Sequence, residues 1–214
     1  GCAANSVQRN LDATSSFAQR EAGVPATLYV TEQQRQSAEG RARELLAAPL
    51  TMSGAVELAL RYSPRFQQLL ADSAAAGAAA AQSARLPNPL LDYSGLARGS
   101  VFEIERAVRV SLLDVVLWPQ RQRLAGLQQQ QHRLRSAGDV VGTMVEARQA
   151  WVRAVASAQS VRYAEQVQEA AEASAELARR MQSVGNFSRI ERARQQAFYA
   201  DATTELARTR MQAA

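Results

Sequence analysis

Residues 102–112 read FEIERAVRVSL, and the alternation in this stretch decides the fold class. One set of alternate residues is apolar except for Arg106, and its apolar members are Phe102, Ile104, Val108, Val110 and Leu112. The other set is polar apart from Ala107, and its charged members are Glu103, Glu105 and Arg109. A period of two indicates a β-strand, and about 9–11 residues cross a bilayer in a tilted barrel strand. The stretch therefore predicts a strand with one apolar face, either in a membrane barrel or in a soluble hairpin with one solvated face.

A second, weaker strand is expected just before this one. Residues 90–97 also alternate, and Arg98-Gly99-Ser100 between the two segments predicts a short turn. Pro87-Asn88-Pro89 precedes them, and two prolines so close together remove backbone donors and disfavour a helix. Trp118-Pro119 ends the strand region on the other side, so residues 90–117 are expected to form a β-hairpin region.

The composition of the whole chain favours long helices. Hydrophobic residues make up 47% of the 214 residues but aromatic residues only 6%, and the surplus is largely alanine. Glutamine is abundant, and every basic residue is an arginine. Such a composition is typical of long helices that pack closely through small side chains, and it argues against a compact enzyme core filled with aromatic residues.

Several classes of function are excluded by the sequence. A single cysteine and a single histidine, His132, exclude a disulfide framework and a cysteine or histidine metal cluster within one chain. The phosphate-loop, dinucleotide-binding and nucleophile-elbow motifs do not occur. No apolar run reaches the roughly 18 residues of a membrane-spanning helix. We therefore expect no catalytic residue, no cofactor and no bound metal.

The charged residues raise two further possibilities. The formal net charge is +5, but arginine alternates with glutamate and glutamine over residues 165–180, which favours a solvated helix surface over a nucleic-acid interface. Glu103 and Glu105 could form a carboxylate pair for glycoside hydrolysis. Neighbouring carboxylates on one strand face are more often solvated charges, so an enzyme is the less favoured interpretation.

The N-terminal residues 1–30 are interpreted as a flexible leader. They are rich in serine, alanine and glutamine, lack periodicity, and contain Gly23 and Pro25. Cys2 lies where a cysteine remains when a bacterial lipoprotein signal is trimmed just before its cleavage point. The sequence therefore predicts a lipid anchor on Cys2, the alternative being a free cysteine on a mobile end.

Helices are expected over residues 31–89, before the hairpin region. Thr31 and Thr51 can each cap the start of a helix, because a threonine hydroxyl accepts a hydrogen bond from a free backbone donor. Ser63 followed by Pro64 is an N-cap with proline at the first helical position.

A long helical hairpin is expected over residues 118–214. No proline occurs between Gln120 and Val184, Gly185-Asn186 then breaks the helix, and Ser188 with Glu191 forms a capping box for the next one. Apolar or small residues recur in steps of three and four: Tyr163, Val167, Ala170, Ser174, Leu177, Met181 and Val184, then Ile190, Ala193, Ala197, Ala200, Thr204, Ala207 and Met211. Two such heptad seams predict an antiparallel coiled-coil hairpin with its tip at residues 184–188.

In this order, the segments resemble the TolC family, the trimeric outer-membrane channels of bacterial efflux and type I secretion. Residues 49–64, PLTMSGAVELALRYSP, look like the opening motif of the family. Leu86-Pro87-Asn88-Pro89-Leu90 resembles its junction from helix into the first membrane strand, and residues 181–188, MQSVGNFS, are similar to its periplasmic turn. The resemblance covers roughly residues 45–214.

The resemblance implies a fold and an orientation for the strands. Residues 31–89 would be periplasmic helices, the hairpin would contribute to a transmembrane β-barrel closed by three protomers, and the long helices would form a periplasmic tunnel. Five strand residues would face lipid: Phe102, Ile104, Val108, Val110 and Leu112. Glu103, Glu105 and Arg109 would face a watery lumen.

The resemblance also implies partners and a cellular location. The tip would contact a periplasmic adaptor protein, which links the channel to an inner-membrane pump, through Val184, Gly185, Asn186, Phe187 and Ser188. The homotrimer would be anchored in the outer membrane by lipid on Cys2 and would extend into the periplasm. It would be a passive exit duct for small molecules or metal ions, with no nucleic-acid partner.

The sequence departs from the family in two respects. The family has two copies of the helix–strand–strand–helix unit per chain, whereas this sequence has one, and the helix after Ser188 is much shorter than the one before it, so a truncated piece is expected. The turn at Arg98-Gly99-Ser100 is short, which suggests a small extracellular loop. The alternative is a periplasmic adaptor or another coiled-coil scaffold, although adaptors bracket their hairpin with glycine-rich β segments and none precedes Gln120.

Overall fold

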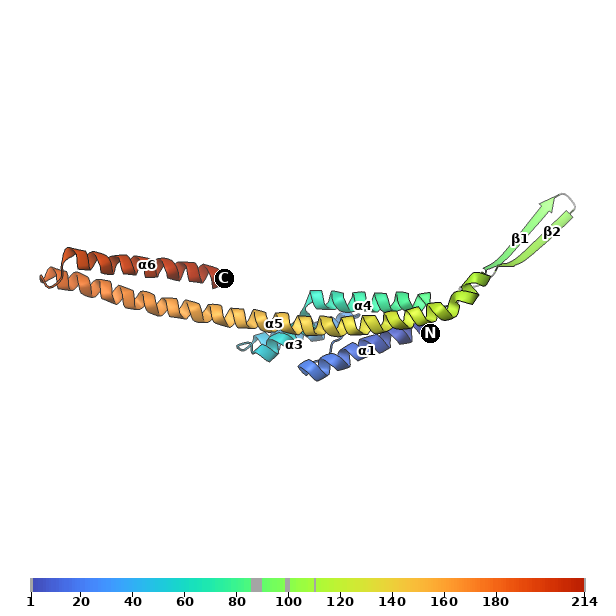
Figure 1. Ribbon diagram of the computed structural model, residues 1–214, viewed down its shortest axis with the longest axis horizontal. Coiled ribbons are helices and arrows are strands. Elements are labelled where there is room, and N and C mark those ends of the chain that lie inside the picture. Colours follow the sequence, from blue (N-terminus) through green and yellow to red (C-terminus); the bar gives the residue numbers. More distant parts are fainter. Residues whose placement is uncertain (1, 86–89, 99–100, 110, 214) are drawn as a thin grey trace. The chain divides into compact units, whose positions relative to one another are not determined.

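The protein is mainly helical with one two-stranded hairpin, as the sequence predicts. The computed structural model describes residues 2–85, 90–98, 101–109 and 111–213 (Figure 1), with side chains at all of these except 2–6, 95–98, 101–105 and 112. The elements in chain order are α1 (Cys2–Ala22), α2 (Glu32–Leu46), α3 (Met52–Tyr62), α4 (Pro64–Ser83), β1 (Leu90–Arg98), β2 (Val101–Arg109), α5 (Leu112–Ser183) and α6 (Arg189–Ala213). Two compact units divide the chain, a first unit (Gly1–Val145) and a second unit (Glu146–Ala214).

Helix α1 occupies most of the N-terminal segment, so the prediction of a flexible leader over residues 1–30 is wrong. Asn10, Thr14 and Ala18 lie one helical turn apart and are buried, and α1 contacts α4. The Asn10 Oδ1 accepts a hydrogen bond from Arg133 Nε of α5 at 2.9 Å. Apolar residues recur at helical spacing beside this face, with Val7 and Leu11 half-buried, so the sequence carried a helical signal that the buried polar residues obscured.

The helix starts predicted at Thr31, Thr51 and Ser63 are confirmed. Thr31 forms a complete capping box with Gln34. The hydroxyls of Thr51 and Ser63 accept hydrogen bonds from the backbone N–H groups three residues later, at 3.0 Å and 3.4 Å. Each cap satisfies a backbone donor that has no partner within its own helix.

The core of the first unit is thin and contains many small side chains. The buried residues of α4 follow one another at helical spacing: Phe66, Leu70, Gly77 and Ala80. Those on the N-terminal part of α5 are Ala125, Ser136, Val140 and Met144. The two helices approach closely where the hydroxyls of Ser73 and Ser136 lie 2.6 Å apart. Small residues permit this approach because little side-chain volume has to fit between the backbones.

An ion-pair network joins α2 to α3. The Nε of Arg41 lies 2.9 Å from a carboxylate oxygen of Glu57, and its NH1 lies 2.9 Å from one of Glu44. Hydrogen bonding by Arg41 holds the pKa of Glu57 below its ordinary value of 4.5. The stability that this pair contributes is therefore present above the ordinary pKa and is lost as the pH falls through the lowered one.

The end of the hairpin differs from the prediction. β2 ends at Arg109 and α5 begins at Leu112, so the expectation that Leu112 is a lipid-facing strand residue is wrong. Residues 112–117, expected in the hairpin region, are helical, and Pro119 lies inside α5 instead of ending the strand region. Val110 lies outside the described residues.

Local interactions explain why the helix starts so early. The Ser111 hydroxyl accepts a hydrogen bond from the Asp114 N–H at 3.4 Å. The Asp114 carboxylate, which also pairs with Arg121, lies in the first turn, where the helix dipole favours negative charge. The Trp118 Nε1 donates to the Ala84 carbonyl at 3.0 Å and so connects the start of α5 to the end of α4.

The second unit is an antiparallel pair of helices, as predicted. It consists of the part of α5 after Val145 and the whole of α6 (Figure 1). Glu165 of α5 and Arg210 of α6 form an ion pair at 2.7 Å, and Arg192 of α6 donates to Gln182 of α5 at 2.9 Å. These pairs join early residues of one helix to late residues of the other, which establishes the antiparallel direction.

The buried seam between these helices does not follow the predicted heptad positions. The buried residues are Ala164, Ala171 and Ala178 on α5, and Ala202 and Leu206 on α6. Of the large apolar members of the predicted seams, Val167 and Met181 are half-buried, and five are 58% to 76% exposed: Tyr163, Leu177, Val184, Ile190 and Met211. On α5 the buried seam is one residue later than predicted. Alanine at every seventh position allows closer contact between the helices, so several of the larger residues remain exposed.

Truncating one leucine on the buried seam and one on the predicted heptad seam tests which of the two seams holds the helices together. Leu206→Ala, at the buried seam, is expected to lower the free energy of unfolding by about 2–5 kcal/mol, because it removes apolar contacts and leaves a cavity. Leu177→Ala is expected to change it by less than about 0.5 kcal/mol. Urea unfolding at low protein concentration, followed by circular dichroism, measures both. A larger loss for Leu177→Ala would support the heptad seam predicted from the sequence.

Candidate functional site

The strand hairpin is the first candidate site, because its register sorts the residues into two unlike faces. Directly paired residues of an antiparallel ladder lie on the same face. Leu91 pairs with Val108 and Tyr93 with Arg106, and the pairs Gly95–Ile104 and Ala97–Phe102 continue this face. This face is therefore apolar apart from Arg106 and the hydroxyl of Tyr93.

The other face of the hairpin is mixed and carries all the charged residues of the two strands except Arg106. Its pairs are Leu90–Arg109, Asp92–Ala107, Ser94–Glu105, Leu96–Glu103 and Arg98–Val101. Arg109 forms an ion pair with Asp92 at 2.8 Å on this face. The carboxylates of Glu103 and Glu105 belong to side chains outside those described. The register nevertheless assigns Glu103, Glu105 and Arg109 to one face, as the sequence predicts.

The described side chains at the foot of the apolar face are exposed. Leu91, Tyr93 and Val108 are each at least 65% exposed. The guanidinium carbon of Arg106 lies 6.0 Å from the centroid of the Tyr93 ring, within the range of a cation–π contact. Of the predicted lipid-facing residues, Phe102, Ile104 and Val108 lie in β2 on this face.

The tip between α5 and α6 is the second candidate site, and its turn is built as the sequence predicts. Gly185 has a φ of 82°, in the left-handed region that favours glycine. Its N–H donates to the Gln182 carbonyl at 3.1 Å, and the Asn186 N–H donates to the Met181 carbonyl at 2.9 Å. These two bonds form a Schellman motif, which satisfies the carbonyls at the end of α5.

The start of α6 confirms the predicted capping box. The Ser188 N–H donates to a Glu191 carboxylate oxygen at 2.8 Å, and the Glu191 N–H donates to the Ser188 hydroxyl at 3.2 Å. These bonds to Ser188 lower the pKa of Glu191. Val184, Asn186 and Ser188 are exposed while Phe187 is half-buried, so the tip presents an accessible turn.

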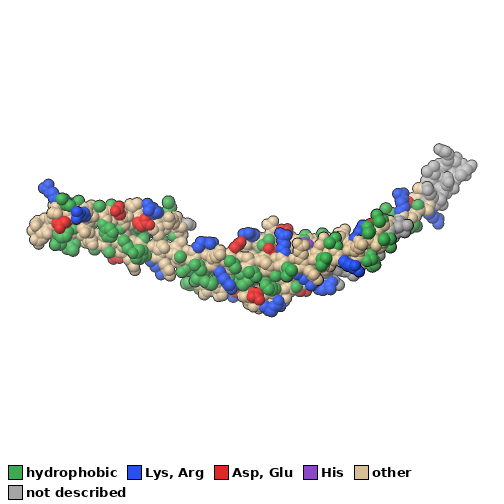
Figure 2. Space-filling model, viewed as in Figure 1, with side chains coloured by type: hydrophobic (Ala, Val, Ile, Leu, Met, Phe, Trp, Pro, Cys, Tyr) green, Lys and Arg blue, Asp and Glu red, His purple; other side chains and the backbone are tan. Residues whose placement is uncertain are grey.

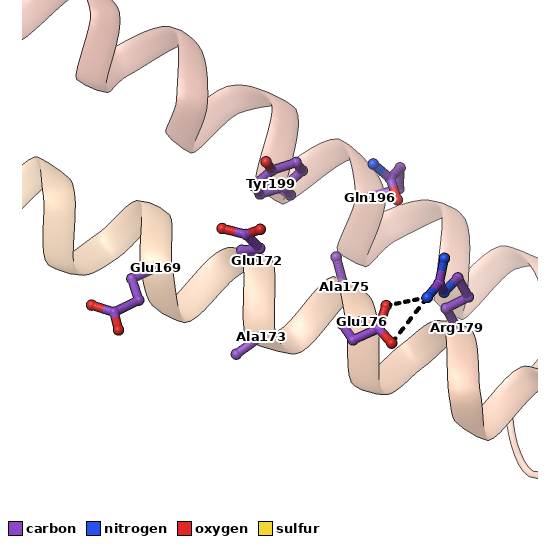
Figure 3. Close-up of a pocket in the computed structure, with 8 residues that line it drawn as sticks. All are labelled: Glu169, Glu172, Ala173, Ala175, Glu176, Arg179, Gln196 and Tyr199. Atoms are coloured by element: carbon purple, nitrogen blue, oxygen red, sulfur yellow. Dashed lines mark hydrogen bonds and ion pairs between the residues drawn. The ribbon is translucent and has the colours of Figure 1, made fainter.

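An acidic groove lies between α5 and α6 next to the tip (Figure 3), with a volume of about 520 Å³. Its lining residues are Glu169, Glu172, Ala173, Ala175, Glu176, Arg179, Gln196 and Tyr199. Arg179 and Arg180 each lie 2.8 Å from the Glu176 carboxylate, and their hydrogen bonds lower its pKa. The spacing of the three glutamates by three and four residues was the sequence signal for this groove, which the sequence analysis did not identify.

The remaining predicted residues do not form a further site. Cys2 lies in α1, with its side chain outside those described. His132 lines a small cavity of about 210 Å³ between α4 and α5, beside Asp72 and Asp139. The described side chains include no cluster of three or more acidic, histidine or cysteine residues suited to a metal ion. Of the helices in the described ranges, none is long and apolar enough to cross a membrane.

Comparison with known proteins gives no relative for this chain: no family model, curated protein or solved structure matches it.

Two substitutions at Gly185 test the geometry of the tip. Gly185→Val is expected to lower the free energy of unfolding by about 1–2 kcal/mol, because a β-branched residue is strained at positive φ. Gly185→Asn is expected to lower it by clearly less, because asparagine tolerates the left-handed region. Thermal unfolding of the two variants and the unchanged protein measures the difference. Equal losses for valine and asparagine would show that the backbone angle is not the reason for glycine.

Proposed function

We propose that this chain is part of a trimeric outer-membrane channel resembling the TolC family, a passive exit duct for small molecules or metal ions. The observation that carries the proposal is the hairpin register, which makes one face apolar apart from Arg106 and places every other charged residue of the two strands on the opposite face. In a barrel, the first face would contact lipid and the second a watery lumen.

The hairpin requires further strands if it lies in a membrane. A two-stranded sheet has two open edges, and each edge leaves backbone N–H and C=O groups without partners. Unpaired backbone groups cannot remain in hydrocarbon, where no water replaces the lost bonds. Closure of a barrel by strands from three protomers supplies the missing partners.

Helix α5 supports self-association, because in the first unit it is apolar on two opposite sides. One side is buried within the unit, as at Ala125 and Val140. The opposite side carries an exposed stripe: Leu113, Val116, Leu124, Leu127, Leu134, Val141 and Val145. Hydrophobic side chains are visible at the surface in Figure 2. A helix that is apolar all round is normally buried, so a second copy of the chain is expected to cover this stripe.

The tip and the adjacent groove fit the role of a docking surface for an adaptor. The turn at Gly185 is held by two backbone bonds and by the Ser188–Glu191 capping box, so it presents a defined shape. In the proposed assembly this tip contacts a periplasmic adaptor, which connects the duct to an inner-membrane pump. Lipid on Cys2 would anchor the protein to the outer membrane.

Arginine substitutions on the two faces of β2 test their assignment. Ile104→Arg is expected to reduce membrane assembly about fivefold, because it adds a charge to the lipid-facing side at the middle of the strand, further from the membrane boundary than Arg106. Ala107→Arg, on the opposite face, is expected to assemble as the unchanged protein does. The measurement is the fraction of heat-stable oligomer recovered from outer membranes. Equal losses at the two positions would contradict the assignment of lipid and lumen faces.

A charge placed on the exposed stripe of α5 tests self-association. Leu134→Glu is expected to shift the detergent-solubilised protein from trimer to monomer, because a carboxylate would be buried in the interface without a partner. Gln122→Glu adds the same charge at an exposed position on the side of α5 away from the stripe and is expected to leave the trimer intact. Sedimentation velocity measures the distribution. Dissociation by both variants, or by neither, would argue against burial of the stripe between protomers.

A further inference from the structure

Arg106 is the exception on the apolar face of the hairpin. By register, the other residues of that face are uncharged: Leu91, Tyr93, Gly95, Ala97, Phe102, Ile104 and Val108. The face therefore offers Arg106 no carboxylate. On the opposite face the situation differs, since Arg109 is paired with Asp92 at 2.8 Å.

The neighbour of Arg106 is an aromatic ring. Tyr93 pairs directly with it across the ladder, with 6.0 Å between the guanidinium carbon and the ring centroid. Tyr93 is 68% exposed and Arg106 is also exposed, so the guanidinium N–H groups remain accessible from outside the hairpin. A ring in this position supports the guanidinium without neutralising its charge.

The position of Arg106 along β2 determines which part of a lipid its side chain can contact. It lies three residues before Arg109, where β2 ends, which corresponds to about 10 Å along the strand. With a barrel tilt of about 40°, its Cα would lie about 8 Å from the end of the strand, measured along the membrane normal. A long arginine side chain can extend over such a distance to the headgroup level, where tyrosine is also enriched.

From this placement we infer that Arg106, supported by Tyr93, binds the phosphate group of a membrane lipid at the periplasm-facing boundary of the barrel. The guanidinium presents paired N–H donors that match two phosphate oxygens. The apolar residues beside it, Leu91 and Val108, would contact the acyl chains of the same lipid. This inference rests on the proposed function, because it requires the apolar face to meet lipid.

Vesicle partition tests the inference with defined lipids. The full chain is mixed with vesicles of digalactosyldiacylglycerol, which has no charge or phosphate, and with the same vesicles containing phosphatidylglycerol. We expect stronger binding of the unchanged protein to the second kind. Arg106→Gln is expected to lose about fivefold of that enhancement, and Arg106→Lys to retain most of it. Arg109→Gln, which removes the same charge from the opposite face, is expected to retain it as well. Circular dichroism verifies that each variant is folded.

The outcomes separate the lipid contact from the proposed function. Failure of the unchanged protein to bind either vesicle would contradict the membrane function itself. Equal binding to both vesicles would keep the hairpin in the membrane but overturn the phosphate contact. If Arg106→Gln and Arg109→Gln lost the same share of the binding enhancement, the enhancement would depend only on the net charge of the protein, and the specific role of Arg106 would be overturned. Complete competition by inorganic phosphate at constant ionic strength would assign the site to the free anion and overturn the lipid assignment.

Discussion

Close packing of helices through small side chains is the constraint on which the rest of the structure depends. In the second unit the helices meet at Ala164, Ala171 and Ala178, and in the first unit α4 and α5 approach to 2.6 Å between the hydroxyls of Ser73 and Ser136. Such contacts bury little apolar surface per residue, so each unit alone gains limited hydrophobic stabilisation. The helix caps and the ion pairs along the helices contribute part of the remaining stability.

The same constraint determines which residues remain at the surface. In the second unit alanine forms the buried seam of α5, and larger residues such as Tyr163 and Leu177 lie outside it. In the first unit Leu127 and Leu134 of α5 also lie outside the buried side. A contiguous apolar stripe at the surface of a helix indicates an interaction site rather than random exposure. Self-association would complete the burial that the single chain leaves unfinished.

In the described part of the chain, the hairpin also lacks partners, both for the backbone groups at its two outer edges and for its apolar face. Its two strands satisfy each other along one side only, and its apolar face at Leu91 and Val108 has no covering element in contact with it among the described residues. An interpretation as a membrane strand pair accounts for both features with one environment, because lipid covers the face and neighbouring strands complete the edges. In that interpretation Arg106 and Tyr93 lie near the membrane boundary, where the charged end of a long side chain on the apolar face can still reach water.

Features that depend on neighbouring residues could be predicted from the sequence alone: the caps at Thr31, Thr51 and Ser63, the turn at Gly185, and the two-residue alternation of the hairpin. Each is decided by hydrogen bonds or sterics within a few residues. Helix α1 has a helical repeat of apolar residues, as at Val7 and Leu11, but the burial of Asn10 and Thr14 depends on contacts with α4 and Arg133 that the sequence does not reveal. The tertiary structure also decided that Ala171, and not Leu177, forms the seam: both fit a heptad, and only the distance of closest approach between two helices distinguishes them.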